Sequence, residues 1–486
     1  MENKKVLNNF IWRFMERIGA QGVTFIVSIV LARLLDPSLY GTVALVTVFT
    51  AIMQVFVDSG FGIALVQKKD ADDLDFSTVF YFNIVMCVAL YGVMFLIAPL
   101  IAAFYEIPEL TAIVRVSSFS LVISGVRSIQ QSYVSKNMLF KRFFYSTIGG
   151  TIVSAVVGIW MAFAGFGVWA IVAQNLVNLA AGTVILWVTV RWRPKWMFSL
   201  NRLINLFSYG WKLLVSALLD TVYKDIRQLI IGKLYTTDDL AFYNKGTQFP
   251  QLIVTNVNSS IDSVLLPAMS SEQDNRERVK AMTRRAIKTS TYIMMPMMVG
   301  LAVCAEPLIK IILTEKWLPC VFFLRIFCFT YAFYPIHTAN LNAIKAMGRS
   351  DMFLRLEVIK KVIGITALLT TMWISVEAMA YSLLVTTVIS QMVNASPNKK
   401  LLGYSYFQQV GDMLPQITLS AAMGAIVYCV SLLPINEYLI LLIQVPLGVL
   451  IYVAGSAIFK FESFKYVLSV VKSYFHKGKA KNDNRS

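Results

Sequence analysis

The sequence predicts an all-α integral membrane protein with about fourteen transmembrane helices. Of its 486 residues, 57% are hydrophobic and only 15% are charged, whereas about a quarter of the residues of an ordinary soluble protein are charged. The mean hydropathy is +0.64. Apolar runs of roughly 18 to 25 residues recur from end to end, and each is long enough to cross a hydrocarbon core of about 30 Å as a helix.

Hydropathy and loop residues place these helices in order along the chain. A first group of six is predicted near 10–33, 40–66, 77–103, 111–133, 144–164 and 167–190. A second group of six follows near 209–232, 247–268, 287–309, 318–342, 356–374 and 377–396, and two more helices lie near 416–434 and 437–459. The predicted organisation is a six-helix lobe (1–200), a second six-helix lobe (201–398), two additional transmembrane helices (399–460) and a basic tail (461–486).

The two groups of six match each other at an offset of about 200 to 210 residues, which is typical of a duplicated transporter fold. Arg115 and Arg127 lie 12 residues apart, as do Arg325 and His337, and both pairs correspond at an offset of 210. Because each group has an even number of helices, both enter the membrane from the same side. We therefore expect two parallel repeats that form two lobes around a central cavity.

Basic residues gather in every second connection, whereas the intervening loops are short and almost free of lysine and arginine. They are Lys136, Lys141 and Arg142, then Arg191, Arg193 and Lys195, then the segment 276–288. The positive-inside rule places these connections and both termini in the cytoplasm. Topology and attraction to anionic headgroups account for the net charge of +17, so no nucleic-acid partner is expected.

Several kinds of site are absent from the sequence. There is no GxxxxGK[ST] phosphate loop, which argues against an ATPase within the chain. His337 and His476 are the only histidines and have no second ligand at helical spacing, so neither a metal nor another cofactor is expected. The five cysteines lie in or beside apolar runs without CxxC spacing, which indicates small core residues. The sequence thus favours a carrier driven by a gradient over an enzyme.

Ionisable residues inside the predicted spans are informative, because each costs roughly 2.5 to 3.5 kcal/mol at the membrane centre. On the first helix they follow one stripe of Asn9, Arg13, Glu16, Arg17, Ala20 and Thr24, and on the seventh one of Ser208, Lys212, Ser216, Asp220, Lys224 and Arg227. The predicted substrate-binding residues are Arg13, Arg17, Arg127, Lys212, Lys224 and Arg227. The predicted acidic or ion-coupling residues are Glu16, Asp58, Asp220, Asp225, Asp262 and His337.

Structural roles remain open for the same residues. The basic side chains near the ends of spans could extend to the interface, and Asp220 could form a local ion pair with Lys224. Asp58 precedes Ser59 and Gly60, so it could cap a helix. A hydrogen bond between helices is the alternative for His337.

One segment resembles a known family. Residues 31–70, LARLLDPSLYGTVALVTVFTAIMQVFVDSGFGIALVQKKD, are similar to the opening of the bacterial polysaccharide transporters, a branch of the multidrug/oligosaccharidyl-lipid/polysaccharide exporter superfamily. The resemblance covers nearly the whole chain. Its most recognisable pieces are Leu34-Leu35 with Pro37 and Tyr40-Gly41, the turn Asp58-Ser59-Gly60-Phe61-Gly62, and Lys136-Asn137-Met138 with Phe140.

The resemblance implies a flippase that carries an undecaprenyl-pyrophosphate-linked oligosaccharide across a bacterial inner membrane by alternating access. The product would be O-antigen lipopolysaccharide, capsule or exopolysaccharide, and a polysaccharide polymerase, H⁺ or Na⁺ could be partners. One rival is a cation-coupled drug antiporter of the same superfamily, which would need an acidic cavity rather than these basic stripes. Another is a membrane-embedded polymerase or ligase, for which the outer loops are short. A scaffold or channel would explain neither the duplication nor the stripes.

Overall fold

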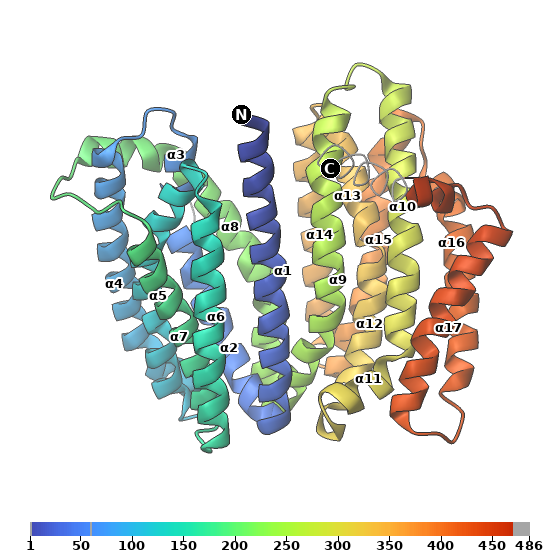
Figure 1. Cartoon of the computed structure of the whole chain (residues 1–486), viewed down its shortest axis with the longest axis horizontal. Helices are drawn as coiled ribbons and strands as arrows, with labels where there is room; N and C mark the ends of the chain where they lie inside the picture. The colour runs from blue at the N-terminus through green and yellow to red at the C-terminus, as the bar shows by residue number, and fades with distance from the viewer. Residues whose placement is uncertain (1, 59–60, 470–486) are drawn as a thin grey trace, which may run out of the picture. The chain divides into compact units, whose positions relative to one another are not determined.

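The computed structural model describes residues 2–58 and 61–469, except for the side chains of residues 2–11, 13, 14, 17, 18, 63, 208–210 and 213. Every regular element in this part of the chain is helical (Figure 1). The chain divides into two compact units, Met1–Ala241 and Phe242–Ser486. We call them the first and the second unit.

The first unit contains eight helices. They are α1 (Glu2–Leu34), α2 (Pro37–Asp58), α3 (Phe61–Gln67), α4 (Asp73–Tyr105), α5 (Leu110–Lys136), α6 (Phe140–Phe163), α7 (Val168–Thr189) and α8 (Leu200–Leu234). The next helix, α9 (Thr237–Ser270), begins in the first unit and continues into the second.

The second unit contains the rest of the described helices. They are α10 (Arg276–Val303), α11 (Ala305–Ile312), a 3₁₀ turn (Glu315–Trp317), α12 (Cys320–Ala332), α13 (Tyr334–Ala346), α14 (Ser350–Thr371), α15 (Val376–Leu402), α16 (Tyr406–Val430) and α17 (Glu437–Ile458). The predicted tail from residue 461 is described only as far as residue 469.

Ten segments of the described chain are long and apolar enough to cross a membrane, with α12 and α13 counted as one. Four further helices are long but more polar: α1 with 33 residues, α8 with 35, α9 with 34 and α14 with 22. The ten apolar segments and these four helices together match the predicted number of about fourteen transmembrane helices. Because lipid does not tolerate charged faces, these four helices must turn their polar sides toward protein or water.

The helices of the two halves follow each other in the same order and at the predicted offset. Helix α5 spans 27 residues from Leu110, and the segment α12–α13 spans 27 residues from Cys320. Arg115 Nε donates to the carbonyl oxygen of Phe95 at 3.2 Å, and Arg325 Nε donates to that of Ala302 at the same distance. The same side-chain contact thus recurs at equivalent positions of the repeat.

One predicted span is interrupted in the structure. The span predicted over 318–342 is divided at Phe333, and Pro335 occupies the first turn of α13. A proline there fits because its missing N–H would have no helical partner in the first turn. The span predicted over 40–66 corresponds to α2 and α3, and residues 59 and 60 between them lie outside the described residues.

Both ends of α8 are attached to α4 in the first unit. At one end Arg202 Nη1 lies 3.0 Å from Oδ1 of the buried Asp75. At the other, Lys233 Nζ lies 2.9 Å from Glu106 Oε1, and Tyr105 donates its hydroxyl to the Leu229 carbonyl at 3.3 Å. The lobe boundary predicted at residue 200 precedes α8, whereas the compact units divide inside α9.

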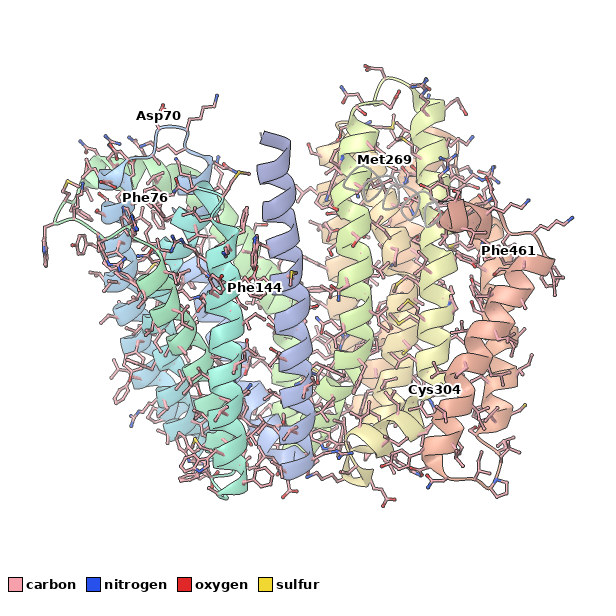
Figure 2. The ribbon with its side chains drawn as sticks, in the orientation of Figure 1. Asp70, Phe76, Phe144, Met269, Cys304 and Phe461 are labelled. Atoms are coloured by element: carbon pink, nitrogen blue, oxygen red, sulfur yellow. The ribbon has the colours of Figure 1, made fainter. Side chains whose placement is uncertain are left out.

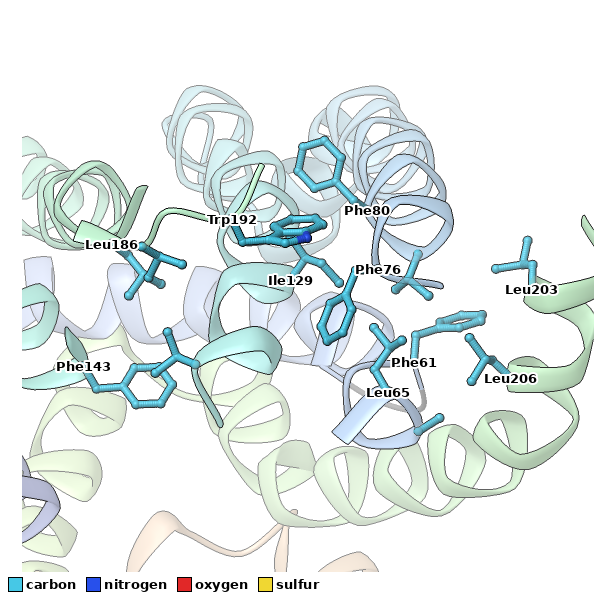
Figure 3. Packing of buried hydrophobic residues seen from close by; sticks show 14 residues of the cluster. Phe61, Leu65, Phe76, Phe80, Ile129, Phe143, Leu186, Trp192, Leu203 and Leu206 are labelled. Carbon is cyan, nitrogen blue, oxygen red and sulfur yellow. The ribbon is translucent and has the colours of Figure 1, made fainter. Parts of the chain in front are cut away.

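A hydrophobic cluster in the first unit holds the N-terminal end of α8 (Figure 3). Leu203 and Leu206 of α8 belong to the same buried cluster as Phe61 and Leu65 of α3. Phe76 of α4, Ile129 of α5 and Trp192 after α7 complete its centre. Burial of such side chains contributes about 1.5 to 3 kcal/mol each, so this cluster stabilises the packing of α8 on the first unit.

Glycines and small side chains bring helices of the first unit close together. A Cβ on Gly150 of α6 would lie 2.7 Å from the carbonyl oxygen of Asn178 and 3.0 Å from the amide nitrogen of Gly182, both on α7. The Ser146 hydroxyl donates to the Gly182 carbonyl at 2.6 Å. Cys87 of α4 occupies the space beside Gly125 of α5 and is buried, as predicted for a small core residue.

Three other cysteines, including Cys304 (Figure 2), are also buried, whereas Cys429 is exposed.

Candidate functional site

A polar cavity of about 420 Å³ lies within the first unit, between α2, α5 and α7. Its wall consists of Gln54, Asp58, Ser120, Ser124, Arg127, Gln131, Asn175, Asn178 and Leu179. Eight of these nine side chains are polar, although all three helices are apolar enough to span a membrane. Such a concentration of polar groups inside spanning helices makes this cavity the candidate functional site.

Helical spacing explains how the sequence builds this wall. Residues 120, 124, 127 and 131 of α5 recur at intervals of four, three and four, so they share one face. Residues 175 and 178 of α7 are three apart, and residues 54 and 58 of α2 are four apart. Each helix therefore contributes one narrow polar stripe.

Hydrogen bonding within the wall is sparse. Gln54 Nε2 donates to Asp58 Oδ1 at 3.0 Å. The other polar side chains make no hydrogen bond to any residue that the structure describes; they are Ser120, Ser124, Arg127, Gln131, Asn175 and Asn178. Of their atoms only the Nε of Arg127 is buried, so the other donors and acceptors remain open to water or to a ligand in the cavity.

Among the described residues of this wall, Arg127 is the only one with a basic side chain. Its Nε is buried without a hydrogen-bond partner among the described residues. The guanidinium interacts electrostatically with two carboxylates, Glu16 of α1 and Asp58 of α2. Glu16 also accepts a hydrogen bond from the Thr147 hydroxyl of α6 at 3.0 Å. Three predicted site residues from three helices are thus electrostatically linked.

The predicted stripe on α8 stays accessible instead of joining this cavity. Lys212, Asp220 and Lys224 are exposed. Arg227 is half-buried, with an Nε that lacks a partner among the described residues. Asp225 accepts a hydrogen bond from Gln228 at 3.0 Å. The other two predicted basic residues, Arg13 and Arg17 of α1, lie outside the described side chains.

The two predicted site residues of the second unit are each bonded to an amide. Asp262 Oδ1 of α9 accepts from Asn342 Nδ2 of α13 at 2.9 Å. His337 Nδ1 of α13 lies 2.9 Å from Asn394 Nδ2 of α15. The alternative of a hydrogen bond between helices therefore describes the observed environment of His337.

Sequence reasoning had missed the amides and hydroxyls of the cavity. Gln54, Gln131, Asn175 and Asn178 are uncharged, so a search for costly charges passes over them. Their signal was the recurrence of polar residues at helical spacing in apolar spans, with Arg127 in the middle of one such stripe.

Comparison with known proteins identifies the family. A family model described as "Polysaccharide biosynthesis protein" matches residues 30–322, which is more than half of the chain. The chain belongs to this polysaccharide biosynthesis protein family. Within the matched range lie α2, α5 and α7, which form the polar cavity.

Curated relatives carry related names. The teichuronic acid biosynthesis protein TuaB of Bacillus subtilis (strain 168) is 25% identical over 397 residues, covering 79% of this chain and 80% of TuaB. The lipopolysaccharide biosynthesis protein WzxC of Escherichia coli (strain K12) is 21% identical over 443 residues, covering 87% of this chain and 88% of WzxC. The succinoglycan biosynthesis transport protein ExoT of Rhizobium meliloti (strain 1021) is 23% identical over 314 residues, covering 65% of this chain and 64% of ExoT.

Solved structures share the fold of this family member. The lipid II flippase MurJ in an inward closed conformation aligns with a TM-score of 0.74 at 17% identity, covering 92% of this chain and 98% of MurJ. An inward-facing multidrug resistance MATE family transporter of the MOP superfamily aligns with a TM-score of 0.64 at 13% identity, covering 78% of this chain and 94% of the transporter. The chain is therefore a multi-pass membrane protein with a MurJ/MATE-like fold.

Proposed function

We propose that this polysaccharide biosynthesis protein is a flippase. Its cargo is an undecaprenyl-pyrophosphate-linked oligosaccharide, which it moves by alternating access from the cytoplasmic to the outer face of a bacterial inner membrane. Both termini lie in the cytoplasm in this proposal, and the released oligosaccharide passes to a polymerase. The names of TuaB, ExoT and WzxC, and the flippase whose fold the chain shares, support this proposal.

The observation that carries the proposal is the polar cavity of the first unit. It combines a guanidinium, a carboxylate, four amides and two hydroxyls inside helices of membrane-spanning length. Five uncharged side chains of the wall, those of Ser120, Ser124, Gln131, Asn175 and Asn178, would bind an oxygen-rich cargo at little cost, since they have no hydrogen bonds to described residues to give up. A lipid-linked oligosaccharide has such a headgroup.

Basic side chains outside the cavity provide the diphosphate site in this proposal. Lys212 and Lys224 are exposed on α8, and the Nε of Arg227 has no partner among the described residues. Ammonium and guanidinium groups form strong charge-assisted hydrogen bonds with phosphate oxygens. In this proposal Arg13 and Arg17, on the equivalent helix of the repeat, also contact the diphosphate. The carboxylates of Glu16, Asp220 and Asp225 partly offset the positive charge.

A coupling ion, H⁺ or Na⁺, belongs to the proposal as well. Asp58 is the strongest of the three predicted candidates because its carboxylate faces the polar cavity. Asp262 and His337 are each bonded to an asparagine. The cationic-drug antiporter remains the alternative within the same fold, and the exposed lysines of α8 argue against it because they would repel a cationic cargo.

Deletion of the gene tests the function. We expect lipid-linked oligosaccharide to accumulate in the cytoplasmic leaflet, measured by its protection from a membrane-impermeant glycosidase added to spheroplasts. An antiporter would instead sensitise the deletion strain to cationic drugs, and a polymerase would leave single repeat units in the outer leaflet. Either result without cytoplasmic accumulation would contradict the proposal.

Complementation tests the basic residues. We expect Lys212→Ala, Lys224→Ala and Arg227→Ala each to lower transport, because each removes a diphosphate contact. Arg13→Ala, Arg17→Ala and Arg127→Ala complete the set. Arg349→Ala is the matched control, since this exposed arginine is already paired with Asp351 at 2.9 Å. Full activity in all six site variants would rule out the assigned roles.

A further inference from the structure

We infer that the polar cavity of the first unit recognises an uncharged sugar ring of the cargo and is separate from the groups that hold its diphosphate. This inference rests on the proposed function. It assigns the sugar and the diphosphate of the cargo to two different binding sites. Arg127, predicted from the sequence as one of six diphosphate-binding residues, is thereby assigned to the sugar instead.

The charges around the cavity disfavour an anionic occupant. The single guanidinium of Arg127 interacts with two carboxylates, Glu16 and Asp58. Within the described wall this guanidinium faces one carboxylate, Asp58, so a diphosphate entering the cavity would meet repulsion as well as attraction and no excess of positive charge. Between residues 212 and 227, helix α8 carries three basic side chains, Lys212, Lys224 and Arg227, against two acidic ones, Asp220 and Asp225, so its stripe keeps an excess of positive charge. The anion is therefore better placed on α8 than in the cavity.

The uncharged groups of the wall match the chemistry of a sugar. Gln131, Asn175 and Asn178 each present an acceptor oxygen and two N–H donors, and Ser120 and Ser124 present hydroxyls. A sugar hydroxyl both donates and accepts, so it can pair with either end of an amide and can bridge Arg127 to Asp58. An alkyl chain would leave all these groups unpaired.

The dimensions fit part of the cargo rather than all of it. The volume of about 420 Å³ is near the lower end of the roughly 300 to 1,000 Å³ typical of small-molecule sites. Polar groups from three helices surround it, which is the arrangement that distinguishes stereoisomers, because each helix fixes a different hydroxyl. The cavity would thus select among oligosaccharides by one ring.

Binding of soluble probes to the full-length protein in detergent tests this division. The probes are methyl glycosides of neutral hexoses and N-acetylhexosamines and a methyl hexuronide, each titrated by saturation-transfer NMR, and inorganic pyrophosphate, titrated by isothermal titration calorimetry. We expect at least one neutral glycoside to bind saturably and Asn178→Leu to weaken it tenfold or more. Asn137→Leu, on an exposed side chain after α5, is the matched control and should leave binding unchanged.

Competition separates the two subsites. We expect pyrophosphate not to displace the neutral glycoside, and Lys224→Gln to weaken pyrophosphate binding without affecting the sugar. Ser124→Ala is a second cavity variant, which removes one hydroxyl and should weaken sugar binding about threefold. Displacement by pyrophosphate, preference for the hexuronide, or the absence of any saturable neutral glycoside would overturn the inference.

Failure of this inference can be told apart from failure of the proposed function. If deletion causes cytoplasmic accumulation but the glycosides do not bind, the chain is a flippase whose cavity does not recognise the sugar. If the glycosides bind through Asn178 but deletion causes no accumulation, the sugar site stands and the flippase proposal falls.

Discussion

The two units place polar residues on equivalent helices of the repeat but surround them differently. In the first unit the polar face of α5 lines a cavity and its side chains lack partners among the described residues. In the second unit the counterpart α13 is bonded to three neighbouring helices through His337, Thr338, Asn340 and Asn342. Of these four residues only His337 is equivalent to a cavity residue, Arg127, at the offset of 210. His337 is bonded to Asn394, whereas the Nε of Arg127 has no hydrogen-bond partner among the described residues.

The bonds of the second unit are short and converge on buried amides. Asn340 Nδ2 donates to Gln409 Oε1 of α16 at 2.8 Å, and Asn340 Oδ1 accepts from Asn398 Nδ2 of α15 at 2.7 Å. Thr338 donates to Asn258 Oδ1 of α9 at 2.6 Å. The comparison teaches that a polar residue inside a span can serve packing alone, and that its hydrogen bonds to neighbouring helices distinguish this role from one in a cavity.

The largest effect is expected from Gly150→Ala, which tests the packing that holds the cavity wall. The new Cβ would lie 2.7 Å from the Asn178 carbonyl oxygen, and backbone atoms must move to accept it. We expect a loss of about 2 to 3 kcal/mol in the free energy of unfolding, measured by denaturant titration in micelles. Gly92→Ala is the control because no atom lies within 4 Å of its Cβ. Equal effects of the two changes would contradict the packing argument.

A smaller loss is expected from Asn340→Leu in the second unit. The change removes the partner of two buried amides, Gln409 and Asn398. Polar contacts between helices in membranes contribute up to about 1.7 kcal/mol, so we expect a loss of about 1 to 2 kcal/mol in the same titration. An unchanged stability would mean that these bonds do not hold the second unit together.

The matching change in the first unit, Asn178→Leu, should barely alter stability. The Asn178 side chain has no hydrogen bond to a described residue, so none is lost, and we expect a change within about 0.5 kcal/mol. Transport of lipid-linked oligosaccharide should nevertheless fall about tenfold, the effect of about 1.4 kcal/mol from one lost hydrogen bond to the cargo. A destabilisation as large as that of Asn340→Leu would remove the contrast between the units.

The smallest effect is expected where the two units are alike, at exposed ion pairs. Lys233 lies 2.9 Å from Glu106 in the first unit, and Lys310 lies 2.7 Å from Glu437 in the second. The Lys233 ammonium lowers the pKa of the Glu106 carboxyl. A carboxyl whose pKa is lower in the folded state stabilises the fold at every pH above the ordinary glutamate pKa. This stabilisation is lost as the pH falls through the pKa of the folded state.

Glu106→Gln should therefore lower the melting temperature slightly at pH 7 and have no effect in strong acid or in 1 M salt. Glu437→Gln should likewise lower the melting temperature slightly at pH 7 and have no effect in 1 M salt. A large or salt-independent effect of either change would contradict the account of these pairs as exposed and weak.

Much of the fold was predictable from the sequence, because a span needs only length and hydropathy. The offset of 210 residues was visible from Arg115, Arg127, Arg325 and His337, and the same backbone contact by both outer arginines agrees with it. The break at Phe333 was not predicted, since the apolar run continues through it and one proline can also lie within a helix, as Pro296 does in α10.

The site was predictable only in part. Arg127 was found because a charge inside a span is rare, but the amides around it are too common in membrane helices to stand out singly. Asn342 and Asn394, which bond Asp262 and His337, come from distant segments of the chain. Pairing over such distances depends on tertiary packing, which the spacing of residues along one helix does not encode.

The position of α8 decides where the chain can be divided. Helix α1 packs on α6 of its own repeat, whereas α8, its counterpart at the start of the second repeat, packs on α2, α3 and α4 of the first. A fragment that ends at residue 200 would therefore lose the side chains of Leu203 and Leu206 and uncover the buried faces of Phe61 and Leu65. The boundary between the repeats in the sequence is thus a poor place to cut the folded chain.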